Sequence, residues 1–103
     1  MSINIGGYTF EGPHSLTGAL QDRSGIYAVL TSTDGKSFTV IDIGESATVK
    51  SRIEGHDREE CWKRNRHGIL YWAVLYTPNQ PQAGRVRIEQ ALRAEFQPVC
   101  GIR

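Results

Sequence analysis

One carboxylate stands where a strand would normally carry an apolar side chain. Asp42 lies between Ile41 and Ile43 in the segment FTVIDIGES, residues 38–46. Strands disfavour aspartate, and a buried carboxylate is costly unless it is paired or bound to a metal. Because local conflicts of this kind tend to mark functional sites, we expect Asp42 to line a polar site.

Three further residues have the types that phosphate chemistry needs. Arg52 and His56 are four positions apart, so in a helix they share one face. The planar guanidinium of arginine matches phosphate oxygens, and a neutral histidine accepts a proton near physiological pH. Glu89 offers a hard oxygen ligand for Mg²⁺, which usually takes one or two carboxylates together with water and phosphate oxygens. A phosphodiester hydrolase needs this combination of metal ligand, cation and base.

Two strands and two helices are expected to position these residues. Residues 25–32 and 38–43 have strand composition, and the turn between them contains Asp34-Gly35, the strongest hairpin dipeptide. Residues 47–56 and 85–98 have apolar residues at helical spacing, and Pro98 ends the second helix.

Flanking segments complete the expected order of elements. Residues 69–77 have the composition of a third strand, and residues 57–68 are expected to be part helix and part loop. Near the N-terminus, residues 3–13 predict a short strand or extended arm that ends at Pro13. A short helix that Ser15 caps follows, through about Leu20.

Side chains of the first two strands are expected to alternate across the sheet. Val40 and Asp42 then share one side of their strand, and Ile41 and Ile43 share the other. A hairpin between the two strands can bring Tyr27 and Asp42 close together on one face.

This order of elements predicts a small α+β domain. We expect a central antiparallel or mixed sheet of three strands, flanked by helices, with an extra N-terminal strand or arm. A chain of 103 residues is long enough for one domain and too short for two. Without any internal repeat or linker, residues 1–23 are expected to form an arm and short helix packed on a domain of residues 24–103.

The order and spacing of the motifs resemble those of the GIY-YIG nuclease superfamily. Gly25-Ile26-Tyr27 corresponds to the first motif, and Asp42-Ile43-Gly44 stands where the YIG motif belongs. Gly101 stands where many members have asparagine, and the likeness covers about residues 24–101. The rest of the pattern is matched in order by Arg52, His56, Glu89 and Pro98.

The resemblance implies a metal-dependent endonuclease or phosphodiesterase, a hydrolase that cleaves DNA with Mg²⁺ or Mn²⁺. In the family, a glutamate binds the metal, the first tyrosine and the histidine activate water, and the arginine stabilises the phosphate. Carried over by motif, these roles fall to Glu89, Tyr27, His56 and Arg52. Asp42 replaces the second tyrosine, where it can add a metal ligand, pair with Arg52 or serve as the base.

Other charges are expected near this site. Glu45 is expected beyond the strand end, where a second carboxylate repels phosphate unless a metal or an arginine offsets it. Trp62 and Trp72 can stack on bases, although Trp72 within a strand and Trp62 beside Cys61 also fit the core. We expect contacts to the nucleic-acid backbone from Lys50, Arg58, Lys63, Arg64 and Arg66. The alternative for these residues is an ordinary solvated surface.

A rival function stays open beside the nuclease. Taken singly, Tyr27 fits sheet packing, Arg52 fits a solvated helix face, and His56 and Glu89 fit helix ends. The net charge of +1 argues against binding DNA by bulk charge and leaves room for a local basic patch. The rival is a catalytically inactive module of the same fold that binds nucleic acid or a protein partner, as a homodimer or beside a partner domain.

The two cysteines, Cys61 and Cys100, are far apart in the sequence. They form no Cys-x-x-Cys pair, and together with His56 and His67 they match no standard zinc-finger spacing. We expect free thiols in a reducing compartment. The N-terminus lacks the features of a signal peptide and no apolar run is long enough for a membrane helix, so a cytoplasmic location with no membrane contact is expected.

Overall fold

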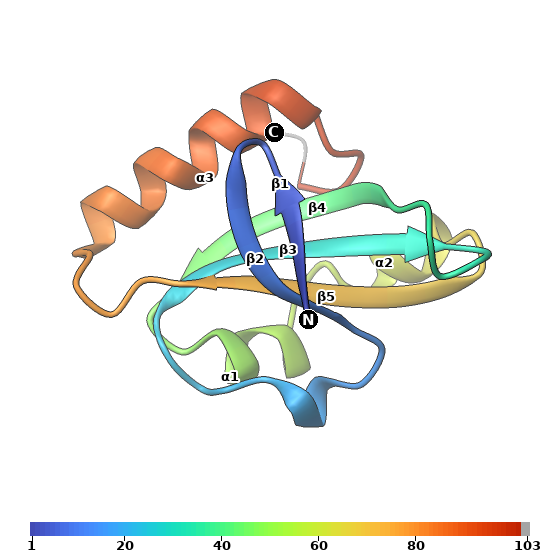
Figure 1. Ribbon diagram of the computed structural model, residues 1–103, viewed down its shortest axis with the longest axis horizontal. Coiled ribbons are helices and arrows are strands. Elements are labelled where there is room, and N and C mark those ends of the chain that lie inside the picture. The colour runs from blue at the N-terminus through green and yellow to red at the C-terminus, as the bar shows by residue number, and fades with distance from the viewer. Residues whose placement is uncertain (102–103) are drawn as a thin grey trace.

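Five antiparallel strands form one sheet in the order β1-β2-β5-β3-β4 (Figure 1). The computed structural model describes residues 1–101, so the last two residues of the expected domain lie outside the described part. The strands are β1 (Ser2–Ile5), β2 (Tyr8–His14), β3 (Gly25–Ser32), β4 (Thr39–Ser46) and β5 (Ile69–Tyr76). The helices are α1 (Val49–Glu54), α2 (Glu59–Arg64) and α3 (Gln82–Phe96), with a short 3₁₀-helix, η1 (Thr17–Ala19).

The α+β class is confirmed, whereas the expectation of a three-stranded sheet is wrong. β5, β3 and β4 are the three expected strands, and every pairing in the sheet is antiparallel rather than mixed. The N-terminal segment adds β1 and β2 as a hairpin whose second strand pairs with β5, with Glu11 opposite Val74. Of the two expected alternatives, a strand or an arm, the N-terminal segment therefore takes the strand form, with two strands in the same sheet.

Gly6 and Gly7 explain how the N-terminal hairpin forms. Both have positive φ, 60° and 89°, which a two-residue hairpin turn of type I′ requires and glycine adopts at no steric cost. These glycines join two strands, β1 and β2, where one short strand or arm was expected over residues 3–13. η1 replaces the longer helix expected over residues 15–20.

Each face of the sheet has its own apolar cluster. Tyr27, Val29 and Trp62 belong to the cluster beneath α1 and α2. Ile26 and Leu92 belong to the cluster beneath α3 and the β1–β2 hairpin. Figure 1 shows α3 on one side of the sheet and α1 on the other. The fold therefore presents Tyr27 to the side where Arg52 and His56 lie.

A β-bulge in β4 changes the expected alternation of side chains. Val29 pairs with Asp42 and Leu30 pairs with Val40, so Ile41 is the extra residue. A bulge lets two consecutive residues lie on one face. Ile41 therefore joins the Tyr27 cluster, on the side where Asp42 accepts from Trp62, while Val40 packs on the opposite side. The prediction that Ile41 and Asp42 face opposite sides is wrong for this reason.

Cys61 and Cys100 form a disulfide, so the expectation of free thiols is wrong. Their Cα atoms are 5.8 Å apart although 39 positions separate them in the sequence. After α3 the chain returns along β4, and the Cys100 amide donates a hydrogen bond to the Ile41 carbonyl. This return brings Cys100 beside α2, which no spacing in the sequence indicates.

No helix within residues 1–101 combines the length and apolar character needed to cross a membrane.

Candidate active site

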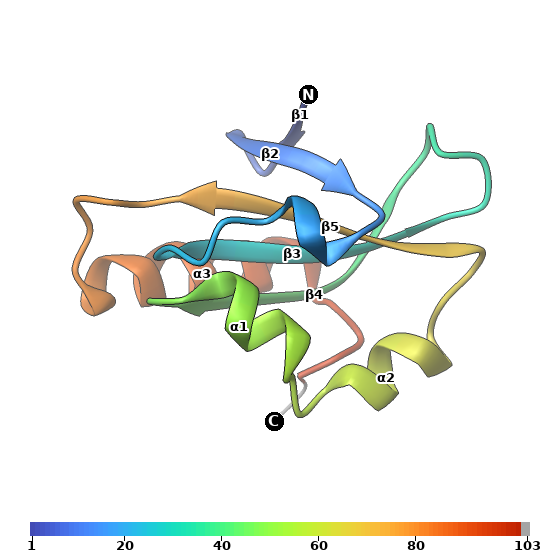
Figure 2. The same ribbon diagram turned by 90° about the horizontal axis from the view of Figure 1, so that it is seen from below.

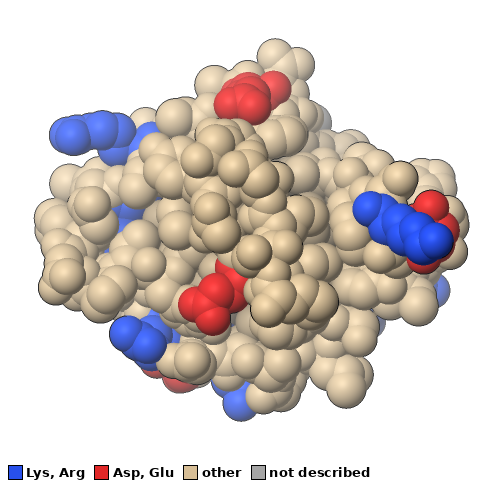
Figure 3. All heavy atoms as spheres, in the orientation of Figure 1, with Lys and Arg blue, Asp and Glu red and all other residues tan. Residues whose placement is uncertain are grey.

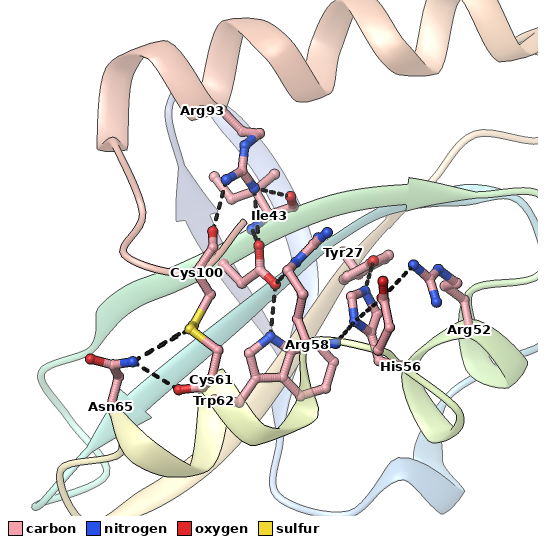
Figure 4. A network of polar contacts seen from close by, with 12 residues as sticks. Tyr27, Ile43, Arg52, His56, Arg58, Cys61, Trp62, Asn65, Arg93 and Cys100 are labelled. Carbon is pink, nitrogen blue, oxygen red and sulfur yellow. Dashed lines mark hydrogen bonds and ion pairs between the residues drawn. A yellow bond between two sulfur atoms is a disulfide. The ribbon is translucent and has the colours of Figure 1, made fainter. Parts of the chain in front are cut away.

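Tyr27 and His56 form the centre of the candidate site (Figure 4). The Tyr27 hydroxyl and His56 Nε2 are joined by a hydrogen bond of 2.5 Å, from the middle of β3 to the loop after α1. Gly44 lies opposite Tyr27 on β4, and a Cβ at that position would overlap the Tyr27 ring. The glycine of the second motif therefore makes the room that the tyrosine occupies.

The second ring nitrogen of His56 identifies its tautomer. The backbone N–H of Arg58 donates to Nδ1 at 3.0 Å, and a backbone amide can only donate. Nδ1 is therefore unprotonated, and the neutral ring carries its proton on Nε2 and donates it to the Tyr27 oxygen. The carboxylate of Asp57 also lies 3.3 Å from Nδ1, but with an acceptor nitrogen this contact is no ion pair.

Burial controls the ionisation of both groups. Burial, followed by the charges of Arg52 and Arg58, lowers the pKa of His56 to about 4. Burial also raises the pKa of Tyr27 to about 12, partly opposed by the same two arginines. The imidazole and the phenol are therefore both neutral near pH 7.

Arg52 lies beside this pair on α1. Its Nη2 donates to the carboxylate of exposed Asp57 at 2.9 Å, and its charge acts on both Tyr27 and His56. The Arg52 side chain is 37% exposed, so it can reach a ligand. An exposed ion pair of this kind is weak, and a phosphate can displace Asp57 from it.

Asp42 is fully buried and pairs with two arginines. Its Oδ2 accepts hydrogen bonds from Arg58 Nε at 2.8 Å and Trp62 Nε1 at 2.7 Å. Its Oδ1 accepts from Arg93 Nη1 at 3.0 Å and from the Ile43 amide at 2.8 Å. The side chain is 0% exposed, and Arg52, one of the partners expected for it, pairs with Asp57 instead.

The Asp42 contacts join several elements (Figure 4). Arg58 and Trp62 belong to the α2 region, and Arg93 comes from the end of α3. Arg93 also donates to the carbonyls of Ile43 and Cys100. Among the described residues the Asp42 carboxylate is thus a buried structural anion. It borders the candidate site through two partners: Arg58, whose amide donates to His56, and Trp62, whose ring lies beside that of His56.

Glu89 lies on the face of α3 that turns toward β4. Arg85 and Arg93 stand four positions before and after it, so the three share one helical face. Both arginines reach β4, at Glu45 and at Asp42 respectively. The half-buried Glu89 therefore lies along the same strand, close enough for its charge to raise the pKa of Tyr27 in part.

The position of Glu45 corrects an expectation. Glu45 lies within β4 and not beyond its end, and it forms an ion pair of 2.9 Å with the buried Arg85. Its charge is therefore already offset within the protein. The sequence analysis missed Arg85 and Arg93, although their spacing around Glu89 is a signal that it could have used.

The expected nucleic-acid residues are not all on the surface. Arg58 turns inward to Asp42, and Lys50 is half-buried. Exposed cations on and after α2 are Lys63, Arg64 and Arg66. Figure 3 shows a face with few charged side chains and no continuous patch of basic ones. Of the five residues expected to contact nucleic acid, only Lys63, Arg64 and Arg66 are therefore exposed, and all three lie on or just after α2.

The two tryptophans have different surroundings. Trp62 is buried at 1% exposure, and its ring centroid lies 4.5 Å from that of His56. Trp72 is partly buried and packs at the margin of the cluster beneath α1 and α2. Trp62 is therefore a wall of the candidate site, whereas Trp72 is only partly enclosed.

A metal at this site would depend on Glu89. Within residues 1–101 no three His, Cys, Asp or Glu side chains gather as a metal-binding group. A single carboxylate is nevertheless within the usual protein share for Mg²⁺, which retains waters and binds substrate phosphate. The carboxylate of Glu89, whose charge acts on Tyr27, is of the right type for such an ion.

Comparison with protein-family models, with curated proteins and with solved structures finds no match for this chain. The likeness to the GIY-YIG superfamily therefore rests on the residues described above.

Proposed function

We propose that this chain is a metal-dependent endonuclease that hydrolyses phosphodiester bonds in DNA. The observation that carries the proposal is the hydrogen bond between Tyr27 and His56, placed within reach of the charges of Arg52 and Glu89. Phosphodiester hydrolysis uses a base, a cation and an oxygen ligand for a metal, and Tyr27, Arg52 and Glu89 are of these three chemical types.

Tyr27 supplies the base in this proposal. Its phenolate oxygen takes a proton from the attacking water as the water oxygen bonds to phosphorus and the bond to the leaving oxygen breaks. The leaving alkoxide takes a proton from solvent. The Nε2–H of His56 donates to the Tyr27 oxygen, and such a bond stabilises the charged form of an acceptor. With a pKa of about 12 for Tyr27, the rate rises with pH through the neutral and mildly alkaline range.

Arg52 and Glu89 act on the phosphate. The Arg52 guanidinium leaves Asp57 and binds phosphate oxygens, whose charge grows in the transition state. Glu89 holds Mg²⁺ or Mn²⁺, which supplies a Lewis acid for the phosphate when bound. Asp42 takes no part in the chemistry, since it is enclosed by its own four hydrogen bonds.

The test is cleavage of supercoiled, linear and branched DNA by the pure protein with Mg²⁺ or Mn²⁺. We expect metal-dependent cleavage that Glu89→Gln and Tyr27→Phe lower by at least about a hundredfold. The matched control is Glu95→Gln, because Glu95 is an exposed glutamate on the same helix. Cleavage that persists in Glu89→Gln, or falls equally in Glu95→Gln, contradicts the proposed site.

One observation favours the rival, a catalytically inactive module that binds nucleic acid. Tyr27 is 1% exposed and His56 is 5% exposed, so little of either reaches solvent. If the wild-type protein cleaves none of the three DNA forms and binds DNA as tightly as Glu89→Gln does, the rival replaces the nuclease.

A further inference from the structure

A hollow of about 340 Å³ lies between η1, α1, α2 and β5. Its apolar wall is formed by Ile53, Trp62, Leu70 and Trp72. Figure 2 shows η1 close to α1, with α2 on the same side of the sheet. Ligand sites are mostly apolar and measure about 300–1,000 Å³. The hollow is therefore large enough for one planar ring system.

The polar lining holds two carboxylates, Glu54 and Glu59, beside one cation, Lys63, and the hydroxyl of Thr17. Glu54 accepts a hydrogen bond from Thr17 Oγ1 at 2.9 Å, and Glu59 pairs with Lys63 at 3.3 Å. Ionised carboxylates only accept hydrogen bonds, and they repel phosphate. An occupant must therefore present N–H donors on an uncharged, flat body, with any phosphate kept outside.

The hollow borders the candidate active site through one side chain. Trp62 lines the hollow, its ring centroid lies 4.5 Å from that of His56 with the two planes tilted by 43°, and its Nε1 donates to Asp42. Lys63 lines the hollow, and the exposed cations Arg64 and Arg66 follow it in the sequence. A nucleotide could therefore place its base in the hollow and its phosphates along the exposed cations.

We propose that the hollow binds an unpaired nucleobase of the DNA substrate that carries an exocyclic amino group, with guanine favoured; this rests on the proposed function. A base outside the duplex is held by stacking between aromatic and apolar side chains and by hydrogen bonds to its Watson–Crick edge. Guanine presents a ring N–H beside its amino group and matches both oxygens of one carboxylate, such as Glu59. Thymine has no amino group. The substrate class is then DNA with a bulged, mismatched or single-stranded base beside the cut.

The test uses 2′-deoxyguanosine and thymidine as probes of the full chain. The protein has two tryptophans, so its two indole N–H signals in a nitrogen-edited NMR spectrum report on both ring walls. We expect deoxyguanosine to shift both signals in a saturable manner and thymidine to shift them much less. Equal shifts with both nucleosides, or none with deoxyguanosine, overturn the proposal.

Two glutamates on α2 provide a matched pair of variants. Glu59→Gln removes an acceptor that lines the hollow, and we expect it to weaken deoxyguanosine binding about tenfold, as for the loss of one charge-assisted hydrogen bond. Glu60→Gln changes its exposed neighbour, which does not line the hollow, and leaves binding unchanged. Equal weakening by both variants contradicts the proposal.

Nucleoside binding and DNA cleavage fail separately in this design. If the wild-type protein does not cleave DNA but binds deoxyguanosine, and Glu89→Gln binds it equally well, the result supports the base-binding hollow and rejects the nuclease. Cleavage without deoxyguanosine binding rejects the hollow and leaves the nuclease.

Discussion

At the scale of the residue, His56 links the candidate site to the stability of the fold. Its folded pKa is about 4, below the ordinary value of 6.5. Between these values the unfolded chain binds a proton that the folded chain does not, so stability is full above about pH 6.5 and falls as the pH approaches 4. A shift of this size corresponds to a loss on the order of 3 kcal/mol.

This pH dependence is the first prediction. Urea unfolding near pH 7 and near pH 5 is expected to give a lower free energy of unfolding at the acid value, by about 2 kcal/mol. His56→Asn removes most of the difference, because no buried imidazole then resists protonation. His67→Asn, at an exposed histidine, keeps it. A wild-type protein with equal stability at both pH values contradicts the tautomer and burial described for His56.

Asp42 raises a second question at the residue scale, namely why a strand carries a buried acid. The carboxylate is 0% exposed and accepts hydrogen bonds from the side chains of Arg58, Arg93 and Trp62. Removing one member of a buried ion pair leaves its partners without a counter-charge, which costs more than the pair itself contributes.

We therefore predict that Asp42→Asn lowers the free energy of unfolding by about 3 kcal/mol. Asp57→Asn, at a 74% exposed carboxylate paired with Arg52, is expected to cost less than about 1 kcal/mol. Chemical unfolding of the two variants beside the wild type checks this. Similar costs for both would mean that the buried network contributes no more than a surface ion pair.

At the scale of the element, the disulfide joins α2 to the chain that follows α3. Cys61 lies in α2, next to Trp62, which lines the candidate site. The carbonyl of Cys100 accepts a hydrogen bond from Arg93. The disulfide and the Asp42 network thus fasten the same two elements. Closing a loop of 39 residues removes entropy from the unfolded chain, worth about 4 kcal/mol.

Reduction is accordingly predicted to lower the free energy of unfolding by about 4 kcal/mol. The measurement is urea unfolding with and without a thiol reductant. A double variant, Cys61→Ser with Cys100→Ser, is expected to match the reduced protein and to be insensitive to the reductant. A wild-type protein whose unfolding does not respond to the reductant contradicts the disulfide.

The sequence indicated elements where local pattern determines structure. β3, β4, β5 and α3 follow from apolar periodicity and from the Asp34-Gly35 turn. The bulge at Ile41 depends on how β3 and β4 pair, and a pattern within one strand does not contain that register. The Cys61–Cys100 bond likewise depends on the path of the chain after α3, which closes only in three dimensions.

The candidate site was indicated in part for the same reason. The motif spacing pointed to Tyr27 and His56, which the structure joins by a hydrogen bond. The sequence pattern predicted that Asp42 lines a polar site, but it did not identify the partners of the carboxylate, because Arg58 and Arg93 come from two other segments. The inward turn of Arg58 also removed one residue from the expected basic surface.

At the scale of the whole molecule, charge limits how DNA can be bound. The net charge is +1, and the face in Figure 3 has no continuous basic patch. Arg58, Arg85 and Arg93 are committed to carboxylates inside the protein. For the proposed nuclease we therefore expect phosphate contacts from Arg52 and from the exposed cations on and after α2, namely Lys63, Arg64 and Arg66.

A weak dependence of DNA affinity on salt is the last prediction. Four phosphate contacts, counting that of Arg52, give a slope of about −4 for the logarithm of the association constant against the logarithm of salt concentration. Replacing Arg64 and Arg66 by glutamine lowers the magnitude of this slope by about 2, because each contact releases about one counterion. Arg87→Gln, an exposed cation on α3, leaves the slope unchanged. If Arg87→Gln lowers the slope equally, or if the double variant leaves it unchanged, the DNA interface does not lie at α2. The proposal that a base of the DNA occupies the hollow beside α2 is then contradicted as well.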